Sequence, residues 1–300
     1  MTGSTPNSGD RDTFPKLLLE NVRVRGNKPA NREKDYGIWL TWTWSEIADE
    51  IQALACGLKS LGVERNDKVT ICGDNRPHLY WAFTAIQSLG AIPVPVYQDS
   101  VAEEMQYVYD HAEAKFAIVE NQEQVDKLLE IKDNLPMLKT IIYNNTRGMM
   151  HYDQDFLHSY KSVQETGREY NTKDPDFFLS SIELGNGEDI CAMLYTSGTT
   201  GRPKGVMLSH NNMAITANNG CIREGLGEDE ETLAYLPMAW IGDNIFSFAQ
   251  AYCAGYCVSC PESSDTVLED LREIGPTYFF APPRIYESLL TTVMIRIEDA

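Results

Sequence analysis

The sequence predicts an α/β protein made of two units, each a parallel sheet flanked by helices. Two observations lead to this fold class. Short apolar runs of strand length alternate with longer segments of helical periodicity along most of the chain, and such alternation is typical of parallel sheets joined by helical crossovers. The chain also has 300 residues, which is enough to bury two ordinary hydrophobic cores.

The first unit contains a helix whose start and end are both marked in the sequence. Thr43 and Glu46 have the spacing of a capping box, apolar residues then recur at helical spacing, and Gly62 ends the pattern. Ser100 and Glu103 repeat the capping-box spacing and predict a second helix start. Strands are expected at 69–72, 92–96, 116–119 and 140–143, and further helices at about 78–89 and 124–135.

A more polar stretch, 144–188, separates the two units and is expected to hold one helix at about 155–165. The second unit then resumes the alternation, with strands expected at 190–195, 232–235, 256–260 and 278–280. The expected division of the chain is a disordered leader at 1–12, a first subdomain at 13–188 and a second subdomain at 189–300.

The charge balance limits the classes of partner. The net charge is −19, from 44 acidic and 25 basic residues, and nucleic-acid phosphates require clustered Lys and Arg. We therefore expect no nucleic-acid partner. No apolar run approaches the roughly 20 residues of a membrane span, and no basic start followed by an apolar run marks a signal peptide. The sequence predicts a cytoplasmic protein without a transmembrane segment.

The seven cysteines are scattered and odd in number, which is typical of reduced thiols rather than a disulfide framework. Cys253, Cys257 and Cys260 are close enough in sequence to suggest zinc as an alternative. Cys257 and Cys260 fall in an expected strand, where a spacing of three places side chains on opposite faces. We expect structural thiols and no metal site built from them.

One segment has the composition of a phosphate-binding loop. It follows the strand expected at 190–195, and its glycines allow backbone N–H groups to turn toward an anion. Its hydroxyls are further donors, and the lysine supplies a positive charge. The candidate ligands are Thr196, Ser197, Gly198, Thr199, Thr200, Gly201 and Lys204.

The spacing of this segment excludes two common phosphate motifs. It lacks the Gly-x-x-x-x-Gly-Lys-Ser/Thr spacing of the P-loop and contains no Gly-x-Gly-x-x-Gly. From composition alone, a flexible surface loop rich in Gly and Thr remains an equal alternative.

The full string at 195–205 is Tyr-Thr-Ser-Gly-Thr-Thr-Gly-Arg-Pro-Lys-Gly. It resembles the phosphate-loop signature of the adenylate-forming family, which includes acyl-CoA synthetases, luciferases and peptide-synthetase adenylation domains. Further segments resemble the same family in the same order, the last of them its long-chain fatty acyl-CoA synthetases. These segments are Thr43–Ile47, Leu89–Pro95, Leu236–Trp240 and Ala281–Tyr286.

The resemblance implies a two-step reaction. A carboxylate attacks the α-phosphate of ATP to give an acyl-adenylate and pyrophosphate, and coenzyme A then displaces AMP. The seven residues named above would hold the β- and γ-phosphates, with Mg²⁺ bridging phosphate oxygens. The implied ligands are ATP, Mg²⁺, coenzyme A and a fatty acid. The large N-terminal domain of this family has the α/β fold expected above.

Trp240 stands where the family places a His or an aromatic residue beside the carboxylate. The resemblance implies that Trp240 forms a wall or gate of the acyl pocket, and ordinary core packing is the alternative. The same two alternatives hold for the apolar stretch that follows it, 245–252.

Several other residues receive weaker interpretations. His210 follows Ser209, a good N-cap, and is expected at a helix start rather than as a base. Asp243 is expected to be a solvated loop acid. Arg284 could meet an anion, but Pro282 and Pro283 before it also make a helix start.

The family's later signatures are not found in these 300 residues. They are the segments for adenine and ribose and the small C-terminal domain with its adenylation lysine, so no catalytic residue is assigned. We expect the N-terminal portion of a long-chain fatty acid–CoA ligase, continued in a parent protein and inactive without its missing C-terminal portion. The alternatives are a truncated nucleotide- or acyl-binding regulatory homologue, and a synthetase for aryl or short-chain acids.

Overall fold

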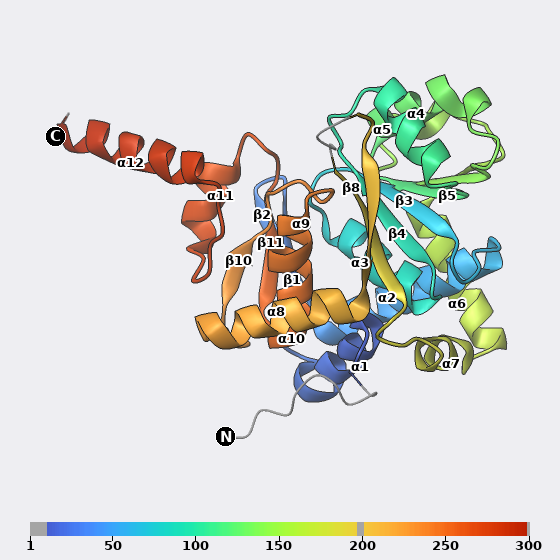
Figure 1. Cartoon of the computed structure of the whole chain (residues 1–300), viewed down its shortest axis with the longest axis horizontal. Helices are drawn as coiled ribbons and strands as arrows, with labels where there is room; N and C mark the ends of the chain where they lie inside the picture. Colours follow the sequence, from blue (N-terminus) through green and yellow to red (C-terminus); the bar gives the residue numbers. More distant parts are fainter. Residues whose placement is uncertain (1–10, 197–200, 299–300) are drawn as a thin grey trace.

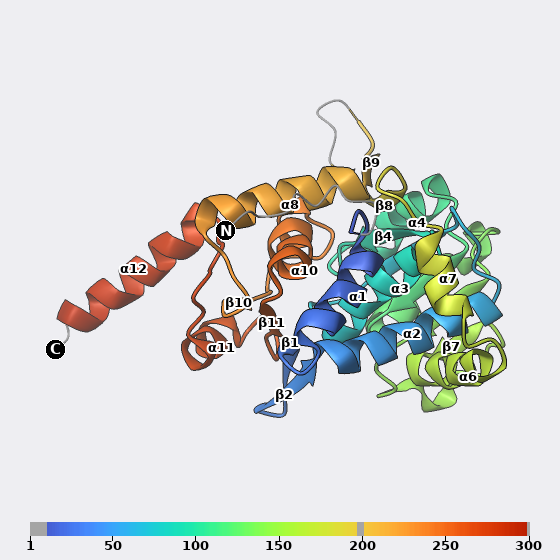
Figure 2. The same ribbon diagram turned by 90° about the horizontal axis from the view of Figure 1, so that it is seen from below.

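Two main sheets with helices around them form the body of the protein (Figures 1 and 2). The computed structural model describes residues 11–196 and 201–298. The larger sheet has the strand order β4-β3-β5-β6-β7, and all neighbouring strands in it are parallel. Its strands are β3 (Lys68–Cys72), β4 (Ile92–Val96), β5 (Phe116–Val119), β6 (Thr140–Tyr143) and β7 (Leu157–Ser159). The α/β prediction and the first four predicted strands are confirmed.

The smaller sheet has the order β10-β11-β1-β2. Its strands are β1 (Pro29–Asp35), β2 (Ile38–Thr43), β10 (Glu231–Leu233) and β11 (Cys257–Cys260). Strand β1 is parallel to β11 but antiparallel to β2. The sheet is therefore mixed, and it combines strands from both sides of the boundary expected at 188/189.

The β1–β2 hairpin was not predicted because β1 is polar. Its cations are neutralised by acids more than 190 positions later in the chain. Arg32 pairs with Glu231, and the Lys34 Nζ lies 2.9 Å from an Asp270 carboxylate oxygen. The hydrophobic periodicity of a short segment cannot reveal such long-range ion pairs.

A separate antiparallel hairpin is formed by β8 (Ile190–Thr196) and β9 (Lys204–Ser209). The strand predicted at 190–195 is confirmed, but the expectation that it would join a parallel sheet is wrong. Strand β9 was missed, and it is mostly exposed. Strand β8 also lies against β4 of the larger sheet.

The polar stretch 144–188 is more regular than expected. It contains β7, α6 (Tyr160–Lys173), α7 (Phe177–Glu183) and a short 3-10 turn, η2 (Met149–His151), so the helix bounds predicted at 155–165 are wrong. A glycine lets α6 pack closely on α2 (Trp44–Ser60), because a Cβ at Gly167 would lie 1.8 Å from the Ala53 carbonyl oxygen.

The remaining helices follow most of the sequence signals. Thr43 and Glu46 form the predicted capping box of α2, whereas Ser100 does not cap α4, which begins after Val101. The region predicted as a strand at 278–280 is irregular. The other helices are α1 (Phe14–Arg25), α3 (Pro77–Ser88), α4 (Ala102–His111), α5 (Gln122–Ile131), α8 (His210–Glu224), α9 (Ile241–Asp243), α10 (Gln250–Ala254), α11 (Val267–Ile274) and α12 (Pro283–Glu298), with a 3-10 turn η1 (Lys132–Asn134) and a π-helix η3 (Asn244–Ala249).

Two features of the chain outside the sheets bear on the sequence predictions. Of the leader expected at 1–12, residues 1–10 lie outside the described part. Asp12, however, accepts a hydrogen bond from the Gly187 backbone N–H at 2.9 Å, so the end of the leader contacts the fold.

Among the described helices, none combines the length and apolarity that a membrane crossing requires.

Helix α3 joins the two sheets. It contacts β1 of the smaller sheet and β3, β4 and β5 of the larger sheet. All of its residues except His78 are buried. A helix that is apolar around its circumference is stable only in an interior position, and α3 forms the common core of both sheets.

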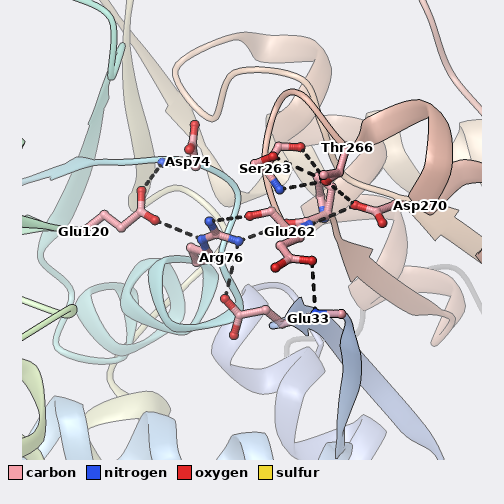
Figure 3. A network of polar contacts seen from close by, with 10 residues as sticks. Glu33, Asp74, Arg76, Glu120, Glu262, Ser263, Thr266 and Asp270 are labelled. Atoms are coloured by element: carbon pink, nitrogen blue, oxygen red, sulfur yellow. Dashed lines mark hydrogen bonds and ion pairs between the residues drawn. The ribbon is translucent and has the colours of Figure 1, made fainter. Parts of the chain in front are cut away.

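The turn between β3 and α3, Asp74–Arg76, ties the sheets together with polar bonds (Figure 3). The Arg76 guanidinium donates to a Glu120 carboxylate oxygen after β5 and to the carbonyl oxygens of Pro261 and Glu262 after β11, each at 2.9 Å. Its Nη1 also lies 3.6 Å from a Glu33 carboxylate oxygen in β1. One side chain therefore contacts both sheets.

The surroundings of Glu33 disfavour a negative charge on its carboxyl group. Burial raises the pKa of Glu33 to about 7, against the lowering effect of Arg76, and the nearby Asp35 and Glu120 raise it further. The guanidinium of Arg76 is therefore needed to offset a concentration of buried carboxylates at this junction.

We expect the substitution Arg76→Ala to lower the free energy of unfolding by about 3–5 kcal/mol, because it leaves buried carboxylates and two carbonyls without their donor. Arg23→Ala is the matched control, since Arg23 pairs with Glu20 but its side chain is 68% exposed and such pairs contribute at most about 1 kcal/mol. Urea denaturation measures the free energy of unfolding of both variants. Equal losses from the two variants would contradict the role given to Arg76.

Candidate active site

The candidate phosphate-binding residues lie at the open end of the β8–β9 hairpin. Thr196 ends β8 and stands opposite Lys204, the first residue of β9, and both side chains are exposed. Gly201 lies on the returning side of the connection. The other four predicted ligands lie outside the described residues, namely Ser197, Gly198, Thr199 and Thr200.

Helix α4 supports both stems of this hairpin. The Tyr107 hydroxyl donates to the Pro203 carbonyl oxygen at 2.9 Å, and the Nδ1 of His111 lies 2.7 Å from the Tyr195 hydroxyl oxygen. The Arg202 guanidinium carbon stands 5.5 Å from the centre of the Tyr107 ring, a distance typical of a cation–π contact.

A cavity of about 710 Å³ opens beside this support, with Tyr107, Tyr195 and Arg202 in its wall. Two cations, Arg202 and Lys204, stand on the returning side of the connection, where the chain enters β9, although the net charge of the chain is −19. This placement suits a polyphosphate, because a local cation at the binding position offsets a repulsive field from the rest of the molecule.

Trp240 belongs to an aromatic group at the carboxyl edge of the smaller sheet. It is half-buried and directly precedes α9. Its ring centre lies 6.1 Å from that of Phe280, and Phe280 stacks on Phe246 with centres 3.8 Å apart. These three rings form an apolar cluster.

The stretch 245–252 is in part ordinary core, and the acyl-pocket alternative stays a prediction for the rest of it. Phe248 and Tyr252 are buried against Phe14 of α1 and form ordinary core. Phe246 instead faces Phe280. The division follows from the local backbone, since 244–249 is a π-helix, which places side chains differently from the α-helical spacing assumed in the sequence.

Asp243 is not the solvated loop acid that the sequence suggested. It is 1% exposed, and burial raises its pKa to about 7 in spite of hydrogen bonds from Tyr80, Ser247 and Asn75. The prediction was wrong because the donors that satisfy Asp243 come mainly from Asn75 and Tyr80, more than 160 positions earlier.

His210 is structural, as the sequence predicted. Ser209 caps α8, and the Nδ1 of His210 accepts a hydrogen bond from the Phe14 backbone N–H at 3.3 Å. Burial lowers the pKa of His210 to about 4, so the ring is neutral at physiological pH. Arg284 is exposed in the first turn of α12.

The cysteines considered for zinc are free thiols. Cys257 and Cys260 are buried in β11, and burial raises the pKa of Cys257 to about 12. Within residues 11–196 and 201–298, no three or more His, Cys, Asp and Glu side chains gather in a group that could hold a metal ion.

Comparison with known proteins identifies the family. The family model described as "AMP-binding enzyme" matches residues 18–298, which is nearly the whole chain. The chain therefore belongs to the AMP-binding family, in agreement with the resemblance found at 195–205.

Among curated relatives, the chain is similar to the long-chain-fatty-acid–CoA ligase ACSBG2 of Homo sapiens, with 32% identity over 285 residues, 92% of this chain and 41% of the relative. The corresponding protein of Xenopus laevis is 30% identical over 284 residues, 92% of this chain and 38% of the relative. The chain thus spans about two fifths of the length of these relatives.

Solved structures agree on the fold. A long-chain-fatty-acid-CoA ligase from Archaeoglobus fulgidus superposes with a TM-score of 0.78 at 19% identity, covering 98% of this chain and 56% of that one. The anthranilate CoA ligase AuaEII, solved with anthranoyl-AMP, gives 0.74 at 24% identity, covering 90% of this chain and 49% of that one.

We expect Gly242→Ala to displace the Trp240 ring, because a Cβ at Gly242 would lie 2.2 to 2.6 Å from three atoms of the indole. The near-ultraviolet circular dichroism of tryptophan should change, and the free energy of unfolding should fall by about 1–3 kcal/mol. Gly227→Ala is the control, since no atom lies within 4 Å of a Cβ there. Identical spectra for the two variants would show that Trp240 is not packed on Gly242.

Proposed function

We propose that the chain is part of an AMP-forming long-chain fatty acid–CoA ligase and supplies the phosphate-binding hairpin and one wall of the acyl site. The observation that carries this proposal is Lys204, exposed opposite Thr196 at the end of the β8–β9 hairpin, in a chain of the AMP-binding family. Relatives with about 30% identity are named long-chain-fatty-acid–CoA ligases, which supports a long-chain acid as substrate.

In the proposed first step, a carboxylate oxygen of the fatty acid attacks the α-phosphorus of ATP. The bond from that phosphorus to the β-phosphate bridging oxygen breaks, and pyrophosphate leaves. The hairpin contributes by holding the β- and γ-phosphates and by stabilising the charge of the leaving pyrophosphate. The proposed ligands are Thr196, Ser197, Gly198, Thr199, Thr200, Gly201 and Lys204.

In the second step, the coenzyme A thiolate attacks the acyl carbon and forms the thioester bond. The acyl C–O bond of the mixed anhydride breaks, and AMP leaves with its electrons. We assign no residue of this chain to proton transfer in either step. Trp240, with Phe246 and Phe280, is proposed to contact the hydrocarbon next to the carboxylate, because an indole offers an apolar face and a single N–H donor.

Magnesium fits this arrangement as an ion held mainly by the nucleotide. The described residues offer no cluster of protein ligands for it, and Mg²⁺ commonly retains water and binds through substrate phosphates. When present, the ion would supply charge neutralisation for the phosphate oxygens next to Lys204. A cytoplasmic location remains a prediction from the sequence.

The test is exchange of labelled pyrophosphate into ATP, with acids of graded chain length. We expect exchange with long-chain acids from the longest protein that the reading frame encodes. We expect none from residues 1–300 alone, because the family's adenine and ribose segments are not found among them. Exchange dependent on aryl or short acids would overturn the proposed substrate class, and exchange by residues 1–300 would overturn the proposed incompleteness.

We expect Lys204→Ala to weaken ATP binding by about 1.5–3 kcal/mol, the usual contribution of a hydrogen bond to a charged group. This corresponds to a dissociation constant about 10- to 150-fold higher. Lys161→Ala is the control, since Lys161 is exposed on α6, outside the hairpin. Titration calorimetry with ATP measures both. An unchanged ATP affinity in Lys204→Ala would contradict the proposal that the β8–β9 hairpin binds the ATP phosphates.

A further inference from the structure

The turn that carries Trp240 is tied to a buried carboxylate. Asp243 lies three residues after Trp240, and its two oxygens accept hydrogen bonds from the Tyr80 hydroxyl at 2.8 Å and the Asn75 side-chain amide at 3.2 Å. Both donors are themselves buried. An apolar side chain in this position would avoid the cost of burying a carboxylate, so packing alone does not account for the acid.

Asn75 connects this carboxylate to the strand end that precedes Trp240. The same Asn75 amide nitrogen donates to the Leu236 carbonyl oxygen at 2.9 Å and to the Tyr80 hydroxyl oxygen at 2.7 Å. Asn75 neighbours Arg76 in the turn after β3, which is fixed to both sheets. The Asp243 carboxylate is therefore one of three acceptors that share the two N–H groups of the Asn75 amide, and the backbone leading to Trp240 is another.

A second amide holds the other end of the segment. The Asn244 side-chain nitrogen donates to the Met238 carbonyl oxygen at 2.7 Å and to the Trp240 carbonyl oxygen at 3.0 Å. The carbonyls of Leu236, Met238 and Trp240 are thus held from two sides. Asp243 and Asn244 lie at the junction between α9 and the π-helix η3, and such π-helical turns are frequent at functional sites.

We propose that Asp243 is a positioning residue for the acyl site, acting through Asn75 and Tyr80 to fix the turn that carries Trp240. This proposal rests on the proposed function for the identity of the ligand, a long-chain fatty acid. Asp243 itself is buried and does not touch the ligand. Its oxygens orient the Tyr80 hydroxyl and the Asn75 amide, and Tyr80 also accepts from Asn75. The Asn75 amide in turn holds the Leu236 carbonyl, and thereby keeps the segment that leads to Trp240, and its indole, beside Phe280 and Phe246.

Two variants separate this role from simple packing. Tyr80→Phe removes one donor and introduces no charge. Asp243→Asn keeps the volume but replaces one acceptor oxygen by an N–H donor, which then faces the donor of either Asn75 or Tyr80. Asp270→Asn is the control, because Asp270 is also fully buried, but it pairs with Lys34 and caps the loop before α11.

The first readout is the fluorescence of Trp240, obtained as the difference between each protein and the same protein carrying Trp240→Phe. We expect the Trp240 emission to shift in Tyr80→Phe and Asp243→Asn but not in Asp270→Asn. An unchanged Trp240 emission in Tyr80→Phe would overturn the positioning role, whether or not Asp243→Asn folds. This readout requires no ligand, so it does not depend on the proposed function.

The second readout is the dissociation constant for hexadecanoate, measured with the same variants. We expect it to rise about tenfold in Tyr80→Phe and Asp243→Asn, with the affinity for ATP unchanged. Equal weakening of both ligands, or the same effect in Asp270→Asn, would show a general loss of structure and overturn the proposal. Failure of the wild-type protein to bind hexadecanoate would refute the proposed substrate, while the fluorescence result would still decide the role of Asp243.

Discussion

The turn Asp74–Arg76 is the constraint on which the arrangement of this molecule depends. A buried guanidinium must have partners for its donors, and those of Arg76 are supplied by β1, by the turn after β5 and by the segment after β11. These segments lie far apart in the sequence and belong to different sheets. The two sheets can satisfy Arg76 only in one relative position, and the apolar helix α3, which follows the turn, fills the space between them.

The same turn links the architecture to the candidate site. Asn75 lies in the same turn as Arg76, and its side-chain amide donates to the backbone that leads to Trp240. The position of the proposed acyl wall therefore depends on the junction between the two sheets. The β8–β9 hairpin is supported separately, by Tyr107 and His111 of α4, a helix that follows β4 of the larger sheet. The proposed acyl and phosphate sites thus have different supports, the turn after β3 for the first and helix α4 for the second.

The sequence predicted those parts of the fold that are encoded locally. Apolar runs such as 116–119 became buried strands, and Thr43 with Glu46 became a capping box. The parts that depend on distant partners were missed. The polar strand β1 is stabilised by acids from the other half of the chain, and Asp243 is buried because Asn75 and Tyr80 satisfy it. In the candidate site, the motif at 195–205 was visible, but its antiparallel hairpin and its support by α4 were not.

We propose above that the rings of Trp240, Phe246 and Phe280 bind the hydrocarbon of a fatty acid. Photolabelling of the 300-residue chain with a hexadecanoate analogue carrying a diazirine near the carboxylate, followed by peptide mass spectrometry, tests it most directly. We expect labels within 236–249 and 278–286 that unlabelled hexadecanoate suppresses. Suppressible labels confined to other segments, such as the polar cavity near Glu33 and Asn145, would contradict it.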